Sequence, residues 1–262
     1  MMHSQLHEIV QAKYDEIDGL KQQHLGVDSV LKPVTSFRDS LQSQGLSIIA
    51  EIKRRSPSKG HLATIADPAA LAQSYSQAGA RAVSVLTDQY FDGHLNDLYA
   101  VSQALQDSPC SVLRKDFILD PIQIAQSRYY GADAVLLIVG LLQERTATLL
   151  QYCREYDLQA LVEVHTQDEL AIALQSGAEI IGINNRDLHT FEVDPQHALQ
   201  LLPYMPDSVT RVAESGVSDA KLAQQYAQSG FDAILVGESL VQSSDPNKLI
   251  QALRLGYDAT SC

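Results

Sequence analysis

The sequence contains no tryptophan and only three cysteines among its 262 residues. The cysteines, Cys110, Cys153 and Cys262, form no Cys-x-x-Cys pair, and their odd number fits reduced thiols better than a disulfide framework. Positive charge is also scarce, because 19 Lys and Arg residues stand against 32 Asp and Glu residues and leave a formal net charge of -13 at pH 7. Such a chain lacks the broad positive surface that nucleic acids and anionic lipids require. An anionic ligand would therefore have to be bound by local cations and backbone amides.

Long hydrophobic runs are absent as well. The longest strongly apolar stretch, Ala134 to Leu142, has about half of the roughly 20 residues that a membrane-spanning helix needs. The first 24 residues are polar and charged, without the apolar centre of a secretory signal. We therefore expect a cytoplasmic protein without a membrane span. Its 45% hydrophobic residues are enough for one large core.

Eight short apolar runs recur along the chain, each with the length and composition of a buried β-strand. They lie at residues 46–53, 82–87, 111–117, 134–139, 160–165, 180–185, 210–215 and 233–237. Helix start and stop signals separate several of these runs. The signals are Asp67-Pro68 to Gly79, Asp120-Pro121 to Gly131, Thr166 to Gly177 with Glu169 in a capping-box position, and Ser218 to Gly230. This alternation predicts an α/β protein with parallel strands.

The four helix-ending glycines precede every second strand at a spacing of roughly 50 residues, which is the length of two βα units. The chain therefore divides into four βαβα quarters. Eight such units in this length predict a closed (β/α)8 barrel, the TIM barrel. A doubly wound open sheet is the competing arrangement, but neither GxGxxG nor GxxxxGK[ST] occurs in the sequence.

The N-terminal segment precedes the first predicted strand. Its apolar positions Leu6, Ile9, Val10, Ile17 and Leu20 predict an amphipathic helix that caps the barrel, and a frayed tail is the alternative. No low-complexity linker divides the chain. We therefore expect a single domain over residues 1–262, with 1–45 as an N-terminal helical extension and 46–262 as the barrel.

Polar residues stand at the ends of five predicted strands, where a barrel of this kind carries its active site. Period-two alternation puts them in phase with inward-facing apolar residues. They are Glu51 and Lys53, Lys115, Glu163, Asn184 and Arg186, and Glu214. Unpaired burial of so many charges would cost several kcal/mol each, so a polar pocket is indicated. The alternative is an internal layer of ion pairs, such as Glu51 with Lys53 and Lys115 with Glu163.

Three loops could bind an anion at the same end of the barrel. The loop at 53–60, KRRSPSKG, carries four basic residues, of which Lys53, together with Ser56, is a stronger candidate than Arg54, Arg55 or Lys59. The other two loops, 215–216 and 237–239, follow strands seven and eight, where barrels often bind phosphate through backbone amides. The carboxylate at position 238 should point away from phosphate. The alternative is that the glycines at 216 and 237 only serve tight turns.

Metal ligands are poorly represented. No Cys or His cluster has a zinc-binding spacing. Glu163 and His165 could lie on one face of a strand, but a third ligand is missing. We therefore predict no metal site and expect His165 in or behind the pocket wall.

Six segments carry a family resemblance. They are IAEIKRRSPSKG at 49–60, LRKDFI at 113–118, LVEVH at 161–165, INNRDL at 183–188, VAESG at 212–216 and LVGESL at 235–240. In this order they resemble the indole-3-glycerol phosphate synthase family. The resemblance implies a lyase of tryptophan biosynthesis without metal or organic cofactor. Its reaction would be the ring closure, with decarboxylation and dehydration, of 1-(2-carboxyphenylamino)-1-deoxyribulose 5-phosphate to indole-3-glycerol phosphate.

The resemblance also implies roles for the candidate residues. Lys115 would act as general acid on the ketone. Lys53 would hold the substrate carboxylate and is also a candidate acid for the dehydration, so the assignment of the two protons to the two lysines stays open. Glu163 would be the acid/base of the dehydration, while Glu51 and Asn184 would orient these groups. The implied substrate-binding residues are Ser56, Phe117, Arg186, Glu214 and Ser215, and the implied phosphate-binding residues are Gly216, Gly237, Glu238 and Ser239, with Ser56 beside them.

The pKa of Lys115 would have to fall toward neutrality for efficient acid catalysis. Burial and Lys53 would lower this pKa, and Glu51 would oppose them. Phe117 could form a wall for the aryl ring or simply belong to the core.

Two other functions remain open at this point. A class I aldolase would form a Schiff base between Lys115 and a sugar phosphate, and an inactive barrel could survive as a phosphate-binding subunit. The related phosphoribosylanthranilate isomerase lacks the paired EIKRRSPSKG and LRKDF segments. In each case we expect a phosphorylated small molecule as ligand, no nucleic acid or membrane partner, and a monomer, with weak association with other pathway enzymes left open.

Overall fold

The computed structural model describes residues 4–22, 33–42, 45–56, 59–188 and 190–255. Eight parallel strands form a closed barrel in the order β1-β10-β9-β8-β7-β6-β5-β4, which confirms the predicted (β/α)8 TIM barrel. The strands are β1 (Ser47–Ile52), β4 (Ala82–Leu86), β5 (Ser111–Lys115), β6 (Ala134–Ile138), β7 (Gln159–Val164), β8 (Ile180–Asn184), β9 (Thr210–Glu214) and β10 (Ala233–Val236). A small hairpin, β2 (Arg55–Ser56) and β3 (Gly60–His61), lies in the loop after β1.

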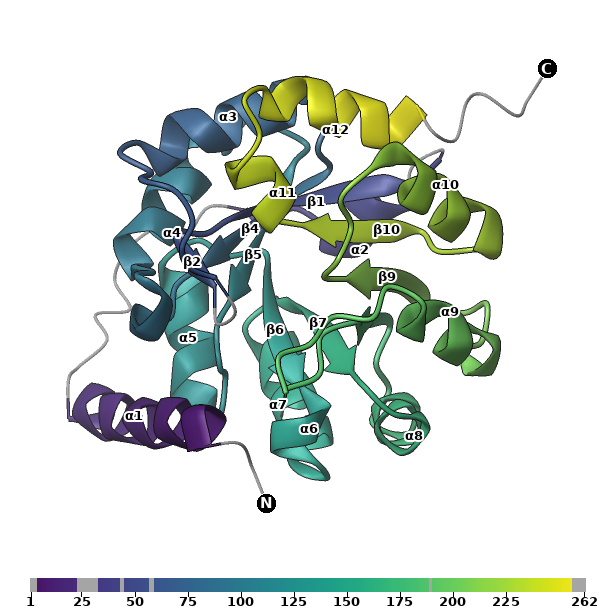
Figure 1. The fold of residues 1–262 in the computed structure, drawn as a ribbon. Helices are drawn as coiled ribbons and strands as arrows, with labels where there is room; N and C mark the ends of the chain where they lie inside the picture. The colour runs from purple at the N-terminus through teal and green to yellow at the C-terminus, as the bar shows by residue number, and fades with distance from the viewer. Residues whose placement is uncertain (1–3, 23–32, 43–44, 57–58, 189, 256–262) are drawn as a thin grey trace.

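Helices surround the ring of strands (Figure 1). Within the described residues they are α1 (Ser4–Lys21), α2 (Phe37–Leu41), α3 (Pro68–Ala78), η1 (Gln89–Phe91), α4 (Leu95–Ala104), α5 (Pro121–Tyr129), α6 (Val139–Leu142), α7 (Arg145–Glu155), α8 (Gln167–Gln175), α9 (His197–Leu201), η2 (Leu202–Tyr204), α10 (Ala220–Ser229), α11 (Glu238–Val241) and α12 (Pro246–Leu255). None of them is long and apolar enough to cross a membrane.

Side-chain caps explain why four helices begin close to where the sequence predicts. In each case an oxygen of the cap accepts a hydrogen bond from a backbone N–H of the first turn. The caps of α3, α5, α8 and α10 are Asp67, Asp120, Thr166 and Asp219. Gly79 and Gly230 end α3 and α10 in the left-handed conformation, which glycine adopts without strain.

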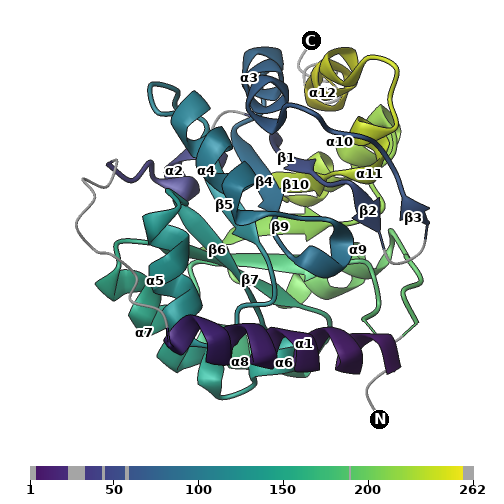
Figure 2. The ribbon, with the colours of Figure 1, turned by 90° about the vertical axis from the view of Figure 1, so that its left-hand side faces the viewer.

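Helix α1 is packed on the barrel, so the alternative of a frayed tail is wrong for Ser4–Lys21. It contacts α5, and in Figure 2 it runs across the front of the molecule with its N-terminal end on the same side as the β2–β3 hairpin. Leu6 and Ile9 in its N-terminal half are 2% and 1% exposed, and Ile17 joins the apolar layer between strands and helices.

The short helix α2 is not predicted from the sequence. Five residues are too few to show a helical period, yet Phe37 and Leu41 belong to the core inside the barrel. Ser47 Oγ donates a hydrogen bond to the carbonyl of Leu41 at 2.8 Å, which ties α2 to the first residue of β1. Helix α2 therefore closes the end of the barrel where the strands begin, opposite the strand ends that carry the polar candidates.

The predicted alternation along the strands is confirmed. Ile49 lies in the core inside the barrel, whereas Ile48, Ala50 and Ile52 pack in the outer apolar layer against helices. The same period continues to the carboxyl ends of the strands, where the inward positions become polar.

Candidate active site

A cavity of about 590 Å3 lies at the carboxyl ends of the strands, within the range of small-molecule sites. Twelve sequence-predicted residues line it: Glu51, Lys53, Lys115, Phe117, Glu163, Asn184, Arg186, Ser215, Gly216, Gly237, Glu238 and Ser239. Two others do not. Ser56 is buried within the hairpin, where its hydroxyl accepts a hydrogen bond from the backbone N–H of Lys59 at 3.3 Å, and Glu214 lies behind Lys115.

Two lysines face this cavity with buried carboxylates behind them. Lys53 Nζ is 2.7 Å from Glu51 Oε2, and Lys115 Nζ is 3.4 Å from Glu163 Oε2. The lysine side chains are 15% and 18% exposed, whereas those of Glu51 and Glu163 are 3% and 1% exposed. The ion pairs of the alternative interpretation thus exist, but they form part of the cavity wall and leave both ammonium groups accessible to a ligand.

The pKa of Lys115 moves opposite to the direction that efficient acid catalysis was expected to need. Burial lowers this pKa, but the neighbouring glutamates, Glu163 first, outweigh burial and raise it well above its usual value. Lys115 therefore stays an ammonium group at neutral pH. The sequence showed Glu51 as an opposing charge but did not show that three glutamate side chains surround one lysine.

Glu214 is a buried carboxyl group with a strongly shifted pKa. Its side chain is 1% exposed, and the nearest cation is Lys115, with Nζ 3.5 Å from Oε2. Burial raises the pKa of Glu214 to about 8, because the attraction of Lys115 does not compensate and the charges of Glu163 and Glu51 add to the rise. The pKa values of Glu51 and Glu163 are instead lowered, since the nearby lysines outweigh the effect of burial. Glu214 is thus the protonated member of this carboxylate cluster at pH 7.

The end of β8 supplies an amide and a guanidinium. Asn184 hydrogen-bonds the carboxylate of Glu163, which lowers the pKa of that group. Its Oδ1 also accepts a hydrogen bond from the backbone N–H of Arg186 at 3.0 Å. Arg186 Nη1 donates to the carbonyl of Phe191 at 2.9 Å, which fixes the loop after β8 at the cavity edge. Asn184 thereby links the Glu163 carboxylate to the arginine.

The loops after β9 and β10 form the opposite side of the cavity. Ser215 and Gly216 have φ values of 64° and 82°, so the backbone turns through two left-handed residues. A Cβ at Gly216 would lie 2.7 Å from Val193 Cγ1, and one at Gly237 would lie 2.2 Å from Glu51 Oε2. The left-handed backbone at Gly216 favours glycine, and a Cβ at Gly237 would displace the side-chain ends of Glu51 and Lys53, so backbone atoms line the cavity there.

Helix α11 starts beside this glycine turn. Ser239 Oγ donates to the carbonyl of Val217 at 2.6 Å, and the Glu238 carboxylate forms an ion pair with Lys59 of the loop after β1. The sequence predicts that this carboxylate points away from phosphate, whereas the structure places Glu238 on the cavity wall with its charge paired to Lys59. A phosphate at this end would meet backbone amides and Lys59.

The basic side chains of the loop after β1 point in different directions, which the sequence does not predict. Arg55 and Lys59 line the cavity, although the sequence indicates Ser56 as the stronger candidate for binding an anion. Arg54 turns away, where it pairs with Asp97 and donates to the carbonyl of Ile65 at 3.0 Å. The hairpin between β2 and β3 causes this division, and two-residue strands leave no readable period in a sequence.

An apolar wall completes the cavity, and most of it was missed. Its members are Leu6, Ile9, Leu86, Phe91, Phe117, Leu136, Ile138, Leu188 and Phe191. Leu86 and Leu136 could have been found as inward positions of their strands. Leu6 and Ile9 were identified only as helix residues, because a sequence does not show which part of a barrel an N-terminal helix reaches.

His165 lies behind the cavity, as expected. Its Nε2 is 3.5 Å from Glu163 Oε1 and its Nδ1 is 3.3 Å from Glu169 Oε2. Burial lowers the pKa of His165, but these two carboxylates outweigh burial and raise it. Among the described residues, no group of three His, Cys, Asp or Glu side chains could hold a metal ion.

Known proteins resemble this chain both in sequence and in three-dimensional structure. A family model described as indole-3-glycerol phosphate synthase matches residues 3–253. Indole-3-glycerol phosphate synthase of Kineococcus radiotolerans is 50% identical over 226 residues, covering 86% of this chain and 80% of the relative. The enzyme of the same name from a Parafrankia species is 52% identical over 215 residues, covering 81% of this chain and 79% of the relative.

Solved structures match the fold at low sequence identity. The tryptophan synthase alpha chain from Legionella pneumophila superposes with a TM-score of 0.65 at 14% identity, over 85% of this chain and 97% of that one. The 3-hexulose-6-phosphate synthase from Salmonella typhimurium also gives 0.65 at 14% identity, over 81% and 98% of the two chains. These similarities support the barrel alone.

Proposed function

Because the chain belongs to the indole-3-glycerol phosphate synthase family, we propose that its reaction takes place in the cavity at the carboxyl ends of the strands, with the roles given below. The chain is a carboxy-lyase of tryptophan biosynthesis. It closes 1-(2-carboxyphenylamino)-1-deoxyribulose 5-phosphate to indole-3-glycerol phosphate, with loss of carbon dioxide and water.

The walls of the cavity match the parts of this substrate. The phosphate fits the backbone of Ser215, Gly216 and Gly237 and the start of α11, where peptide N–H groups are not used by the helix. The benzoate carboxylate fits Lys53, and the aryl ring fits the apolar wall that includes Phe117. Phosphate and ring then lie at opposite ends, with Lys115 between them.

In the ring closure, an aromatic carbon attacks the ketone and forms a carbon–carbon bond. The developing oxyanion accepts a hydrogen bond and then a proton from the Lys115 ammonium group. Since the pKa of Lys115 is raised, this group is charged before the reaction starts and acts mainly by stabilising the oxyanion. Loss of carbon dioxide from the same ring carbon then restores aromaticity.

In the dehydration, the new hydroxyl group takes a proton from the Lys53 ammonium group and leaves as water, and the neighbouring CH2 carbon of the new ring loses a proton to form the indole double bond. The pKa of Glu163 is lowered, so this group begins as a carboxylate that can accept that proton. Asn184 orients the Glu163 carboxylate, and Glu51 holds Lys53 against the substrate carboxylate. Glu214 acts from behind Lys115, because it does not reach the cavity.

The observation that carries these roles is the pair of accessible ammonium groups, Lys53 and Lys115, in one cavity, backed by the buried carboxylates of Glu51 and Glu163 and by the carboxyl group of Glu214 behind Lys115. The test is an indole fluorescence time course with the carboxyphenylamino-deoxyribulose phosphate, since the chain has no tryptophan to contribute background. Lys115→Ala should lower kcat by at least about 100-fold with its thermal transition intact. Exposed Lys248, which pairs with Asp245, supplies the control Lys248→Ala, with unchanged kcat.

The aldolase alternative is disfavoured by the charge state of Lys115. A Schiff base needs a neutral amine, and the surrounding carboxylates keep this lysine protonated. Borohydride treatment in the presence of substrate should therefore leave Lys115 unmodified. Near wild-type turnover by Lys115→Ala would remove the acid role, and a substrate-dependent adduct on Lys115 would restore the aldolase.

We also propose one domain over residues 1–262, a monomer and a cytoplasmic location. The packing of α1 and α2 on the barrel supports the single domain. The buried, free thiol of Cys153 fits a reducing compartment. Light scattering after gel filtration would test the mass in solution.

A further inference from the structure

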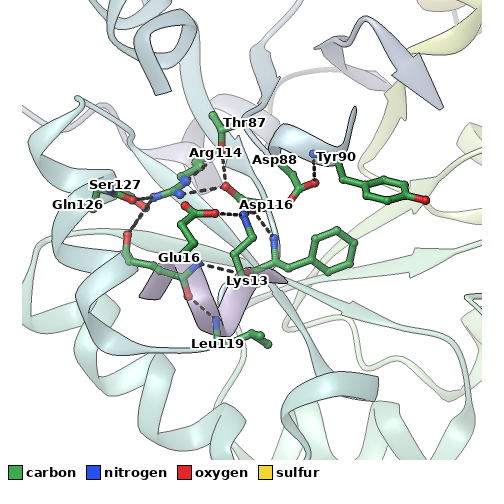
Figure 3. Close-up of polar contacts among 12 residues, drawn as sticks. Lys13, Glu16, Thr87, Asp88, Tyr90, Arg114, Asp116, Leu119, Gln126 and Ser127 are labelled. Atoms are coloured by element: carbon green, nitrogen blue, oxygen red, sulfur yellow. Dashed lines mark hydrogen bonds and ion pairs between the residues drawn. The ribbon is translucent and has the colours of Figure 1, made fainter. Parts of the chain in front are cut away.

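Lys13 is a buried cation in the apolar stripe of α1. It follows Leu6 and Ile9 at helical spacing, four residues before Ile17, and is only 2% exposed. Its Nζ lies 2.8 Å from Asp88 Oδ2, 2.9 Å from Asp116 Oδ1 and 2.8 Å from Glu16 Oε2. Figure 3 shows this lysine pointing from α1 toward the two aspartates. One ammonium group thus joins a helix to the loops after β4 and β5.

Both aspartates are tied to their own loops. Asp88 caps η1, where Oδ1 accepts a hydrogen bond from the backbone N–H of Tyr90 at 2.9 Å. Asp116 Oδ1 accepts one from the backbone N–H of Phe117 at 2.8 Å. Lys13 therefore acts on each loop through a side chain that already fixes the loop backbone.

A second cation holds Asp116 from the opposite side. Arg114 Nη2 donates to Asp116 Oδ2 at 2.9 Å, and Thr87 Oγ1 donates to the same oxygen at 2.6 Å. With Arg114 on one oxygen and Lys13 on the other, Asp116 has one fixed orientation (Figure 3). The position of the next residue, Phe117, is fixed with it.

The three segments that Lys13 joins supply one side of the cavity. Leu6 and Ile9 come from α1, Phe91 comes from η1, and Phe117 follows Asp116. We define these four residues as the α1 wall. Without Lys13, the carboxylates of Asp88 and Asp116 would face each other with Arg114 as the remaining cation on only one of them. Their repulsion would move apart the segments that carry the α1 wall.

We propose that Lys13 is a positioning residue for the ring end of the substrate, because its buried ammonium group sets the spacing of the α1 wall. This inference rests on the proposed placement of the aryl ring. A well-packed apolar side chain could stabilise the helix at this position without the cost of burying a charge. A cation shared by two loops gives a defined geometry instead, which is what a wall for a flat ring needs.

The test compares two inhibitors of the full-length enzyme. Indole-3-glycerol phosphate carries both ring and phosphate, whereas glycerol 3-phosphate carries the phosphate alone. For Lys13→Met we expect KM and the inhibition constant of indole-3-glycerol phosphate to rise about 10-fold or more, with glycerol 3-phosphate inhibition changed less than about 2-fold. Lys13→Arg keeps the cation and should recover part of the ring affinity.

The matched control is Lys21→Met. Lys21 lies on the same helix and also pairs with an aspartate, Asp120 at 2.6 Å, but its side chain is 49% exposed. This variant should keep both inhibition constants. If Lys13→Met folds and weakens both inhibitors equally, or neither, Lys13 is only structural and the inference is wrong.

Two further variants keep the test decisive. If Lys13→Met does not fold, Asp88→Asn removes one partner charge while keeping a good helix cap. Weaker inhibition by indole-3-glycerol phosphate alone supports the inference. An unchanged ratio of the inhibition constants of indole-3-glycerol phosphate and glycerol 3-phosphate overturns it.

Phe117→Ala tests the placement of the ring itself. If Phe117→Ala weakens indole-3-glycerol phosphate and Lys13→Met does not, only the Lys13 inference fails; if neither variant does, the ring placement fails with it.

Discussion

Glu214 determines how the charges at the carboxyl end of the barrel balance. With its pKa raised to about 8, it is neutral at pH 7, so Glu51 and Glu163 face Lys53 and Lys115 as two carboxylates against two ammonium groups. Ionisation of Glu214 would place a third negative charge in the same buried volume. Gly182 helps to accommodate this group, because a Cβ there would lie 2.1 Å from Glu214 Oε1.

The raised pKa of Glu214 has a consequence for stability. The folded state keeps a proton that the unfolded chain has lost between its ordinary pKa of 4.5 and about 8, so stability falls as pH rises through this interval and no further above it. Glu214→Gln cannot lose that proton. We expect the Tm of the wild type to fall more between about pH 5.5 and about pH 8.5 than that of Glu214→Gln, by at least about 3 °C. Calorimetry checks this, and parallel Tm curves would show that Glu214 is already ionised.

Gly237 lies against Glu51 and Lys53 of the proposed catalytic cluster as well as in the proposed phosphate site. An added Cβ would meet Glu51 Oε2 at 2.2 Å and Lys53 Cε at 2.9 Å. Gly237→Ala should therefore lower kcat and also raise KM, reducing kcat/KM by about 10-fold or more. Gly19→Ala is the control, because a Cβ at this α1 glycine would meet nothing within 4 Å. A change in KM alone would confine Gly237 to phosphate binding.

At the scale of secondary-structure elements, β5 shows how one strand serves both layers of the barrel. Leu113 and Lys115 face inward, while Arg114 faces the helices and is completely buried. Its Nη1 donates to Gln126 Oε1 at 3.0 Å and Ser127 Oγ at 3.1 Å of α5, and Nη2 pairs with Asp116. Arg114 thus links β5, its following loop and α5.

Arg114→Met should be strongly destabilising, because it removes one of the two cations paired with buried Asp116 and leaves several buried acceptors of α5 without their donor. Breaking a buried pair of this kind costs about 3 kcal/mol or more, which corresponds to a fall in Tm of roughly 6 °C or more for a chain of this size. Lys248→Met removes an ion pair whose lysine is 83% exposed and should shift Tm by about 1 °C at most. Equal shifts in the two variants would contradict the importance of burial.

The sequence predicted elements where short-range chemistry defines them. All eight strands show their period, and the predicted helices α3, α5, α8 and α10 have side-chain caps. Helices α4, α7 and α9 have no side-chain cap hydrogen bond, and no clear start signal for them is visible in the sequence. Their boundaries depend on packing against the strands, which a local pattern does not contain.

The same distinction applies to the candidate site. Phase along a strand predicted that Glu51, Lys115 and Glu163 point inward. Alternation along a strand shows which side chains face inward but not how far each lies from the cavity. Glu214 was therefore predicted to bind substrate, although it lies behind Lys115. Contributions from distant segments, such as those of Leu6 and Lys13, depend on tertiary packing that a strand-end analysis does not address.

At the scale of the whole molecule, the net charge of the chain and the local charge of the cavity act on the anionic substrate in opposite directions. The chain carries a formal charge of -13, and its substrate has a phosphate and a carboxylate, so the average field repels the substrate. The cavity wall nevertheless includes Arg55, Lys59 and Arg186 besides Lys53 and Lys115. At 0.1 M salt, charges more than about 10 Å apart are largely screened, so the nearby cations should dominate the final approach.

The dominance of the local cations predicts whether kcat/KM falls or rises when salt is added. If the cavity cations control association, raising NaCl from about 0.05 to about 0.3 M should lower kcat/KM several-fold, because salt screens a local attraction. If the total charge controlled it, the same change would raise kcat/KM, because salt would screen a repulsion. Arg55→Gln removes an exposed cation of the cavity wall and should flatten the dependence, whereas Lys248→Gln, whose residue does not line the cavity, should leave the slope unchanged. A kcat/KM that rises with salt, or equal slopes in the two variants, would show that the local cations do not guide the substrate.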